Sequence, residues 1–153
     1  MDKTLLIAKI KDGTVIDHIA SGKSFKVLSI LNIDSSIGYT VTVAVHVPSK
    51  KTGFKDIVKI EGRFLEKEEL DRISLAAPNA AISIIRNYEI TEKFHVEIPE
   101  EITGIIDCPN QNCISNAKEP VKPRFLVRSK NPLSLKCYYC ERLINENEIL
   151  QNL

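Results

Sequence analysis

The sequence predicts an α+β chain of two domains. The first is a ferredoxin-like N-terminal sandwich, an antiparallel sheet with two helices, and the second is a small all-β zinc-ribbon-like domain. Through residues 1–98, the apolar periodicity changes in the order strand, helix, strand, strand, helix, strand. The only four cysteines form two close pairs within residues 99–153. We place the boundary at the Ile98-Pro99 step, where proline and charge interrupt the hydrophobic pattern.

The spacing of apolar residues assigns the individual elements. Alternation is typical of a strand with one buried face, and recurrence every three or four residues is typical of a helix. An Asp-Gly turn follows a short apolar stretch at residues 5–10, Ser24 is a candidate N-cap, and Pro78 ends the second helix. The expected strands are residues 14–19, 39–47, 54–64 and 82–96 (interrupted near Arg86-Asn87), and the expected helices are residues 24–31 and 65–77. In the C-terminal domain, strands are expected at residues 102–106, 125–128 and 133–136, with a terminal strand or turn at residues 146–153.

The four cysteines predict a closed metal site. Four residues separate Cys108 from Cys113, and two separate Cys137 from Cys140. Two such pairs on tight turns form the tetrahedral cage of sulfur ligands that zinc accepts. Because all four ligands are thiolates, no position stays open for water, so we expect one structural zinc ion and no metal catalysis. Two disulfides are the alternative, which the lack of any export signal disfavours.

Charge and hydropathy exclude several classes of function. The formal net charge is +1, and neither the first 98 residues nor the rest has the basic excess of a protein that binds nucleic acid through its phosphates. No apolar run is long enough to span a membrane, and no N-terminal signal peptide is present. We therefore expect a cytoplasmic protein with no nucleic-acid or membrane partner. A zinc-ribbon nucleic-acid-binding or transcription module is the main alternative. An enzyme is a second alternative, but no reactive constellation of side chains is visible.

Taken together, several stretches along the whole chain resemble the regulatory chain of aspartate carbamoyltransferase. Each stretch is moderately specific, and their order and the total length make the resemblance highly specific. They are Gly13-Thr-Val-Ile-Asp-His-Ile19, Lys55-Asp-Ile-Val-Lys-Ile-Glu61, Leu75-Ala-Ala-Pro78, Asn87-Tyr-Glu89, Cys108-Pro-Asn-Gln-Asn-Cys-Ile-Ser115 and Leu135-Lys-Cys-Tyr-Tyr-Cys-Glu141.

The resemblance implies a regulatory subunit without catalytic activity, because in this family a separate chain carries the chemistry. Residues 1–98 would be an allosteric domain that binds the nucleotide effectors CTP, UTP and ATP and responds to pyrimidine biosynthesis. Residues 99–153 would be a zinc domain that docks on the catalytic chain. The family assembles as two catalytic trimers joined by three regulatory dimers, so self-association through the N-terminal domains is also implied.

The resemblance also implies a nucleotide site, residue by residue. Asp17 would contact the ribose, Lys59 the base and ribose, and His18 and Lys93 the triphosphate. The residues expected to line the base pocket are Lys9, Ile10, Val15, Ser83, Ile85, Tyr88 and Ile90. Lys9 and Ser83 depart from the small apolar residue and the Asn of better-known relatives, which bears on effector preference. The residues expected to contact the partner chain are Asn112, Arg128, Lys136, Tyr138 and Glu141.

Overall fold

A computed structural model describes residues 9–117 and 121–153 of the chain, so most of the apolar stretch expected at residues 5–10 lies outside the described residues. The chain divides into two compact units between Val96 and Glu97, two residues before the expected boundary. No helix in the described part of the chain is long and apolar enough to cross a membrane.

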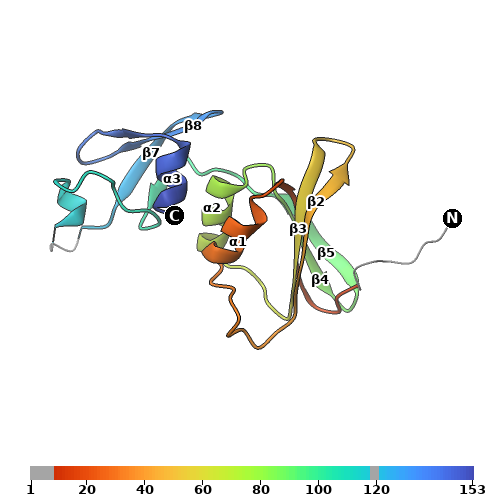
Figure 1. The fold of residues 1–153 in the computed structure, drawn as a ribbon. Helices are drawn as coiled ribbons and strands as arrows, with labels where there is room; N and C mark the ends of the chain where they lie inside the picture. The colour runs from red at the N-terminus through yellow and green to blue at the C-terminus, as the bar shows by residue number, and fades with distance from the viewer. Residues whose placement is uncertain (1–8, 118–120) are drawn as a thin grey trace. The chain divides into compact units, whose positions relative to one another are not determined.

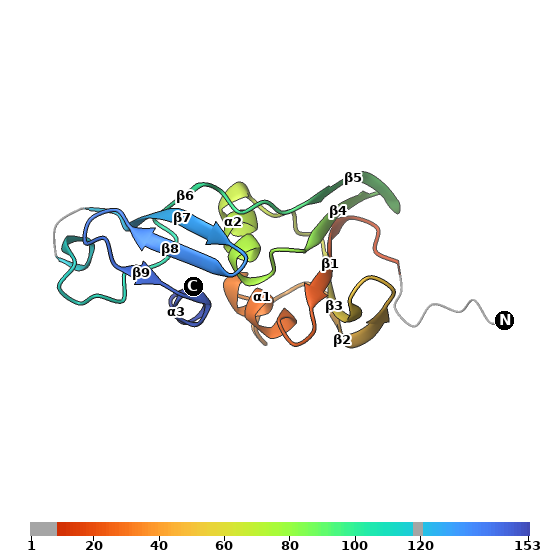
Figure 2. The same cartoon turned by 90° about the horizontal axis from the view of Figure 1, so that it is seen from above.

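The first unit is built on a five-stranded antiparallel sheet with the strand order β2-β3-β1-β4-β5 (Figures 1 and 2). The order of its first four strands is that of a ferredoxin-like sandwich, as predicted. The strands are β1 (Gly13–Ala20), β2 (Val41–Ser49), β3 (Gly53–Glu61), β4 (Ala81–Arg86) and β5 (Glu89–His95). The single strand expected over residues 82–96 is in fact a hairpin, because Asn87 and Tyr88 both adopt positive φ and reverse the chain.

Helices α1 (Ser24–Ile30) and α2 (Lys67–Ala76) cover one face of this sheet (Figure 1). The covered face carries buried aliphatic residues, among them Ile16, Val58 and Ile82, which pack with Val27 from α1 and Ile73 from α2. A capping box between Glu66 and Glu69 starts α2. The prediction of Ser24 as the N-cap of α1 is wrong, because Lys23 is the N-cap residue and the Ser24 hydroxyl donates to Asp56 instead.

The strand register separates the core from the uncovered face. Ile16 lies opposite Val58 on one side and Ile82 on the other, and these residues form a core row under the helices. Side chains alternate along a strand, so the next row points away from the helices. That second row runs across four strands as Lys59, Val15, Ser83 and Lys93, each opposite its neighbour.

Two β-bulges flank the buried carboxylate of Asp56. One interrupts β1 between Ile16 and Ile19 and the other interrupts β2 between Ala44 and Val47, and His18 and His46 in these bulges have positive φ. Asp56 is fully buried and accepts hydrogen bonds from the backbone N–H of Gly22 (2.9 Å), Ser24 (3.1 Å) and His46 (2.8 Å), and from the Ser24 hydroxyl (2.5 Å). One side chain therefore joins the β2 bulge at His46 to the turn and the first residue of α1.

The second unit is a four-stranded antiparallel sheet with a C-terminal helix. Its strands are β6 (Glu101–Thr103), β7 (Arg124–Lys130), β8 (Leu133–Cys137) and β9 (Leu143–Ile144), in that order, and η1 (Ile114–Asn116) is a single 3-10 turn. Residues expected to form a terminal strand or turn instead form helix α3 (Glu146–Gln151), so the domain is not purely β. A capping box between Asn145 and Glu148 starts this helix, and Ile149 anchors it in a core that also contains Phe125 and Leu135.

We predict that Asp56→Ala destabilises the chain by about 3 kcal/mol, because it leaves several buried N–H groups without an acceptor. Urea denaturation followed by circular dichroism measures the loss. Glu68→Ala is the control, since it removes an exposed pair with Arg72 and should cost less than about 0.5 kcal/mol. Equal losses in the two variants would contradict the role of Asp56 as a buried acceptor.

The same interactions predict a dependence on pH. Burial raises the pKa of the Asp56 carboxyl, but hydrogen bonds from Ser24, His46 and Gly22 outweigh it and hold that pKa below the ordinary 3.8. The unfolded chain then binds a proton at higher pH than the folded chain. The contribution of Asp56 to stability is therefore present above the unfolded value and lost as the pH falls through the lower, folded value. The difference in stability between the wild type and Asp56→Ala should shrink correspondingly in acid.

Candidate functional site: a four-cysteine metal centre and a lysine-lined cavity

The four cysteines converge in the second unit as the sequence predicts. Cys108 and Cys113 flank the loop before η1, Cys137 ends β8, and Cys140 follows in the turn to β9. Their sulfur atoms all lie within 4.8 Å of one another, and all four are free thiols. The two disulfides considered from the sequence are therefore absent among the described residues, and the arrangement is that of a metal centre.

The sulfur spacing tests whether a metal ion fits. The Sγ atoms of Cys108 and Cys140 are 3.7 Å apart, and those of Cys113 and Cys137 are 3.6 Å apart. A tetrahedron of sulfurs around an ion at about 2.3 Å has edges of about 3.8 Å. A disulfide would need about 2.05 Å between sulfurs. These two distances thus match the edges of a tetrahedral site, and all four sulfur atoms lie within 4.8 Å of one another.

The environment of the four thiols also favours a bound cation. Burial raises the pKa of Cys108 and Cys137. Burial likewise raises that of Cys140, but hydrogen bonds, led by the backbone of Arg142, outweigh it and lower the pKa to about 7. Thiolates are the ligating form, and a divalent ion compensates the charge that burial disfavours. Asn116 braces the first loop by donating to the carbonyl groups of Cys108 and Asn110 at 2.8 and 2.7 Å.

The first unit holds a cavity of about 360 Å³ on the face of the sheet that the helices leave uncovered. Ten of the eleven residues expected at a nucleotide site line it together. They are Lys9, Ile10, Val15, Asp17, Lys59, Ser83, Ile85, Tyr88, Ile90 and Lys93. Lys59 and Lys93 stand at the two ends of the row that crosses β3, β1, β4 and β5, about 14 Å apart at ordinary strand spacing. The apolar side chains lie between these charged ends.

Asp17 enters this cavity with a partner that the sequence analysis missed. The Lys55 ammonium group lies 3.0 Å from one carboxylate oxygen and 3.3 Å from the other. Burial raises the pKa of Asp17, but the bond from Lys55, the N–H of His18 and the nearby positive charge hold it below the ordinary value. Alternation along β3 puts Lys55 on the same face as Lys59, and this was the signal that could have identified it.

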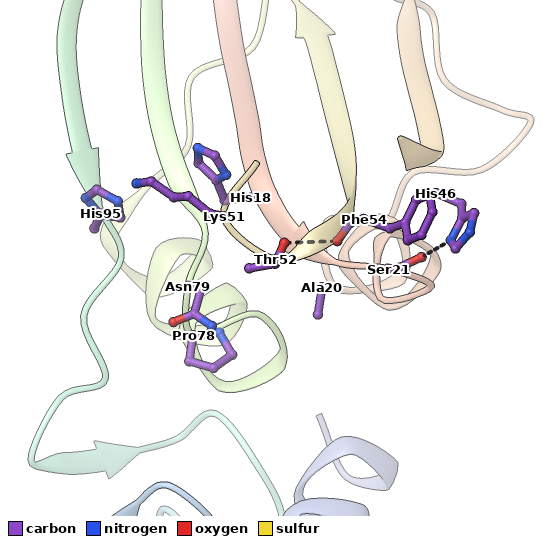
Figure 3. Close-up of a pocket in the computed structure, with 10 residues that line it drawn as sticks. All are labelled: His18, Ala20, Ser21, His46, Lys51, Thr52, Phe54, Pro78, Asn79 and His95. Atoms are coloured by element: carbon purple, nitrogen blue, oxygen red, sulfur yellow. Dashed lines mark hydrogen bonds between the residues drawn. The ribbon is translucent and has the colours of Figure 1, made fainter. Parts of the chain in front are cut away.

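His18 does not line this cavity, although the resemblance groups it with Asp17. The β1 bulge places it among the residues of a different cavity, together with His46 and His95. The two cavities share no residue in the described part of the chain. His18, His46 and His95 lie far apart in the sequence, so the sequence gave no signal that they line one cavity (Figure 3).

The hairpin after β4 forms one wall of the lysine-lined cavity. Tyr88 has φ of 68°, is exposed, and donates its backbone N–H to the carbonyl of Lys11 at 2.9 Å. The neighbouring N–H of Asn87 donates to the Asp12 carboxylate at 3.0 Å. These bonds hold the hairpin tip against the chain that leads into β1, with the tyrosine ring in the cavity wall.

The five residues expected to contact a partner all belong to the second unit. Asn112, Arg128, Tyr138 and Glu141 are exposed, and Lys136 is half-buried. Tyr138 lies in the loop between the second pair of cysteines, edge-on to Tyr139 and 4.2 Å from the Arg124 guanidinium group. These contacts orient the ring while half of its surface stays open to solvent.

Comparison with known proteins assigns both units. The allosteric-domain model of the aspartate carbamoyltransferase regulatory chain matches residues 5–97, and its metal-binding-domain model matches residues 100–150. The chain is similar to the regulatory chains of Thermoplasma volcanium (61% identity; 98% of this chain, 99% of the relative) and Thermococcus kodakarensis (57% identity over the full length of both). The chain belongs to the aspartate carbamoyltransferase regulatory chain family. The predicted family, and a regulatory rather than a catalytic chain, are thereby confirmed.

Membership in the regulatory chain family also supports the assignment of the four cysteines as a metal site. The second unit matches a metal-binding domain, and its four cysteines have the spacing of a tetrahedral site. The all-thiolate set leaves no open coordination position, so an ion bound there would hold the loops together and would have no free position for a substrate.

We predict that Cys137→Ser abolishes metal binding, because three thiolates and a hydroxyl no longer match the cage. Ser134→Ala on the same strand is the control and should bind metal as the wild type does. The metal content of the purified chains, measured by elemental analysis, checks this. Stoichiometric metal in Cys137→Ser would contradict the assignment of the four ligands.

Proposed function

We propose that this chain is the allosteric regulatory subunit of an aspartate carbamoyltransferase, and that residues 1–98 bind CTP, UTP or ATP in the lysine-lined cavity. The observation that carries the proposal is the convergence of ten expected residues around one cavity within the family's allosteric domain. Pyrimidine biosynthesis would be the process under control, and the cytoplasm the compartment.

The charges of this cavity support a phosphorylated ligand. Lys9, Lys59 and Lys93 line it, and none has an acidic partner among the described ion pairs. The one acidic residue, Asp17, is balanced by Lys55. An ammonium group is a compact charge suited to phosphate. The carboxylate of Asp17 can accept hydrogen bonds from ribose hydroxyls.

The ion in the second unit is proposed to be one structural Zn²⁺. Thiolates favour soft metals, and a closed tetrahedral set of four cysteines is a common structural zinc site. With the ion bound, Cys108, Cys113, Cys137 and Cys140 hold the two loops that frame it. Bound metal therefore adds stability that a domain of residues 99–153 needs, because its apolar core is small.

Docking on the catalytic chain is proposed for the metal-binding domain. Apolar side chains are exposed in and beside the loops that carry the cysteines, namely Ile114, Tyr138, Tyr139 and Leu143. Exposed aromatic and aliphatic residues near a rigid centre are typical of interfaces. Asn112, Arg128, Lys136 and Glu141 supply polar contacts around them. The first unit is proposed to pair with a second copy, as the family's regulatory dimers do.

Control of the catalytic chains would follow from linkage. A nucleotide that binds one quaternary state more tightly shifts the assembly toward that state, by no more than its difference in affinity. Coupling of about 1–3 kcal/mol is typical of such systems. The effector would meet the allosteric domain, and the metal-binding domain would carry the contact with the catalytic chain.

We predict a stable complex when the metal-loaded chain is mixed with catalytic trimers of aspartate carbamoyltransferase. Size-exclusion chromatography coupled to light scattering measures the mass of the complex. Cys137→Ser should fail to form it, because the docking loops lose their metal, whereas Ser134→Ala should form it normally. Elution of the wild-type chain apart from the trimers would refute the proposed partner.

We predict that Lys93→Ala weakens binding of a nucleoside triphosphate by roughly tenfold, because one charge-assisted hydrogen bond is lost. Binding of the corresponding nucleoside should change far less. Isothermal titration calorimetry compares the two ligands. Lys11→Ala is the matched control, since its side chain is exposed and does not line the cavity. Equal losses for nucleoside and triphosphate would rule out a phosphate role for Lys93.

A further inference from the structure

The two tyrosines between Cys137 and Cys140 differ in what their hydroxyl groups do. The Tyr139 hydroxyl donates to the carbonyl of Lys122 at 3.0 Å, so this ring is tied back to the chain that leads into β7. The Tyr138 hydroxyl has no hydrogen-bond partner among the described residues, and half of this residue is exposed. Tyr138 is therefore available to a partner protein, whereas Tyr139 braces the turn.

The exposed Tyr138 ring is held in place by a side chain from the neighbouring strand. The guanidinium group of Arg124, on β7, lies 4.2 Å from the centre of the ring. The backbone brings the two residues together, because the Tyr138 N–H donates to the Arg124 carbonyl at 2.8 Å just after the end of β8. A cation over the face of an aromatic ring is attracted by its π electrons. The stacking therefore holds the ring against the sheet.

The guanidinium group of Arg124 is itself held by a carboxylate. Its Nε donates to Glu101 at the start of β6, and the two side chains form an ion pair. The register permits this contact, since Glu101 lies opposite Leu126, and alternation puts Leu126 and Arg124 on the same face of the sheet. Glu101, Arg124 and Tyr138 thus form a continuous row of contacts from β6 to the turn that follows β8.

The side chain of Arg124 can be separated from the core and from the metal centre. The core lies on the opposite face of this sheet, where Phe125 and Leu135 are fully buried. The backbone bond between Tyr138 and Arg124 survives any substitution of the side chain. Glu101 balances the charge of Arg124, and the Tyr138 ring covers one face of its guanidinium group. These contacts favour a role that acts through Tyr138 over direct contact with a partner.

We propose that Arg124 is a positioning residue for docking, which together with Glu101 holds the Tyr138 ring in the orientation in which it meets the catalytic chain. This inference rests on the proposed docking of the metal-binding domain. A side chain that is already fixed loses less conformational freedom on binding, so affinity is gained without a further contact across the interface. The Tyr138 hydroxyl would donate to a carbonyl or carboxylate oxygen of the catalytic chain.

NMR of the full-length, metal-loaded chain tests the stacking before any partner is added. Protons over the face of an aromatic ring are shifted upfield, so the side-chain signals of Arg124 should lie upfield of those of Arg142. Arg142 also pairs with a carboxylate, that of Glu148, but stacks on no ring among the described residues. Tyr138→Ala should remove the difference. Arg124 signals that stay unchanged in Tyr138→Ala would overturn the proposal.

Dissociation of the same chain from immobilised catalytic trimers, measured by biolayer interferometry, tests the positioning role. Arg124→Met should dissociate roughly threefold to tenfold faster, because it removes the cation and keeps a long side chain. Arg124→Lys should recover most of this loss. Lys130→Met is the matched control, since this exposed lysine on the same strand belongs to no described ion pair, and it should behave as the wild type does. Loss of bound metal in Arg124→Met would overturn the proposal in favour of a structural role.

A double-mutant cycle decides whether Arg124 acts through the ring. If it does, Arg124→Met should change the dissociation rate by less than about twofold once Tyr138→Ala is present. Equal losses in both backgrounds would overturn the proposal, since Arg124 would then contact the catalytic chain directly. Failure of the wild-type chain to bind trimers would refute the proposed docking itself. Wild-type dissociation of Arg124→Met would refute only the positioning role, so the two failures are distinguishable.

Discussion

The fold of the first unit depends on how β1 pairs with β3 and with β4. Because Ile16 lies opposite Val58 and Ile82, one set of alternate residues is committed to the core beneath the helices. The other set is committed to the uncovered face, where it brings Lys59, Val15, Ser83 and Lys93 into line. Gly13 shows how tightly this pairing is packed, since a Cβ there would lie 2.0 Å from the carbonyl oxygen of Ile60. A shift of one residue would exchange core and cavity, so the register that folds the domain also builds the site.

The second unit depends on a different constraint. Two loops and two short strand ends meet at the cysteines, while the apolar core beside them is small, with Phe125, Leu135, Ile144 and Ile149 among its buried residues. Metal binding there is coupled to folding, because the unfolded chain has no preformed cage. The exposed tyrosines lie between Cys137 and Cys140, so an ion bound by these two cysteines would hold the turn that carries them. A rigid apolar surface can thus be presented by a domain too small to order it through packing alone.

Much of this could be predicted from the sequence because the signals were local. Alternation assigned the strands, and the cysteine spacing predicted the cage, which has the dimensions of a tetrahedral site. Three features of the structure were not predicted from the sequence. The hairpin at Asn87-Tyr88 uses positive φ at a tyrosine, which propensity does not anticipate. Helix α3 begins with the pair Asn145 and Glu148, a capping signal that was present but not weighed. Alternation along β3 gives the face on which Lys55 lies, but the pairing of Lys55 with Asp17 also depends on the β1 bulge, which no local pattern encodes.

Among the features that were not predicted from the sequence, the β1 bulge has the largest effect on where side chains lie. In a regular strand His18 would follow Ile16 into the core, but one extra residue in β1 returns Ile19 to the core instead and leaves both Asp17 and His18 outside it. Asp17 then lines the lysine-lined cavity, and His18 lines a different cavity together with His46 and His95. Asp56 accepts bonds beside this bulge and the one at His46, so the same buried carboxylate supports the backbone that positions two of the three histidines. Two adjacent residues on a single strand therefore face two different cavities, one lined by lysines and the other by the three histidines.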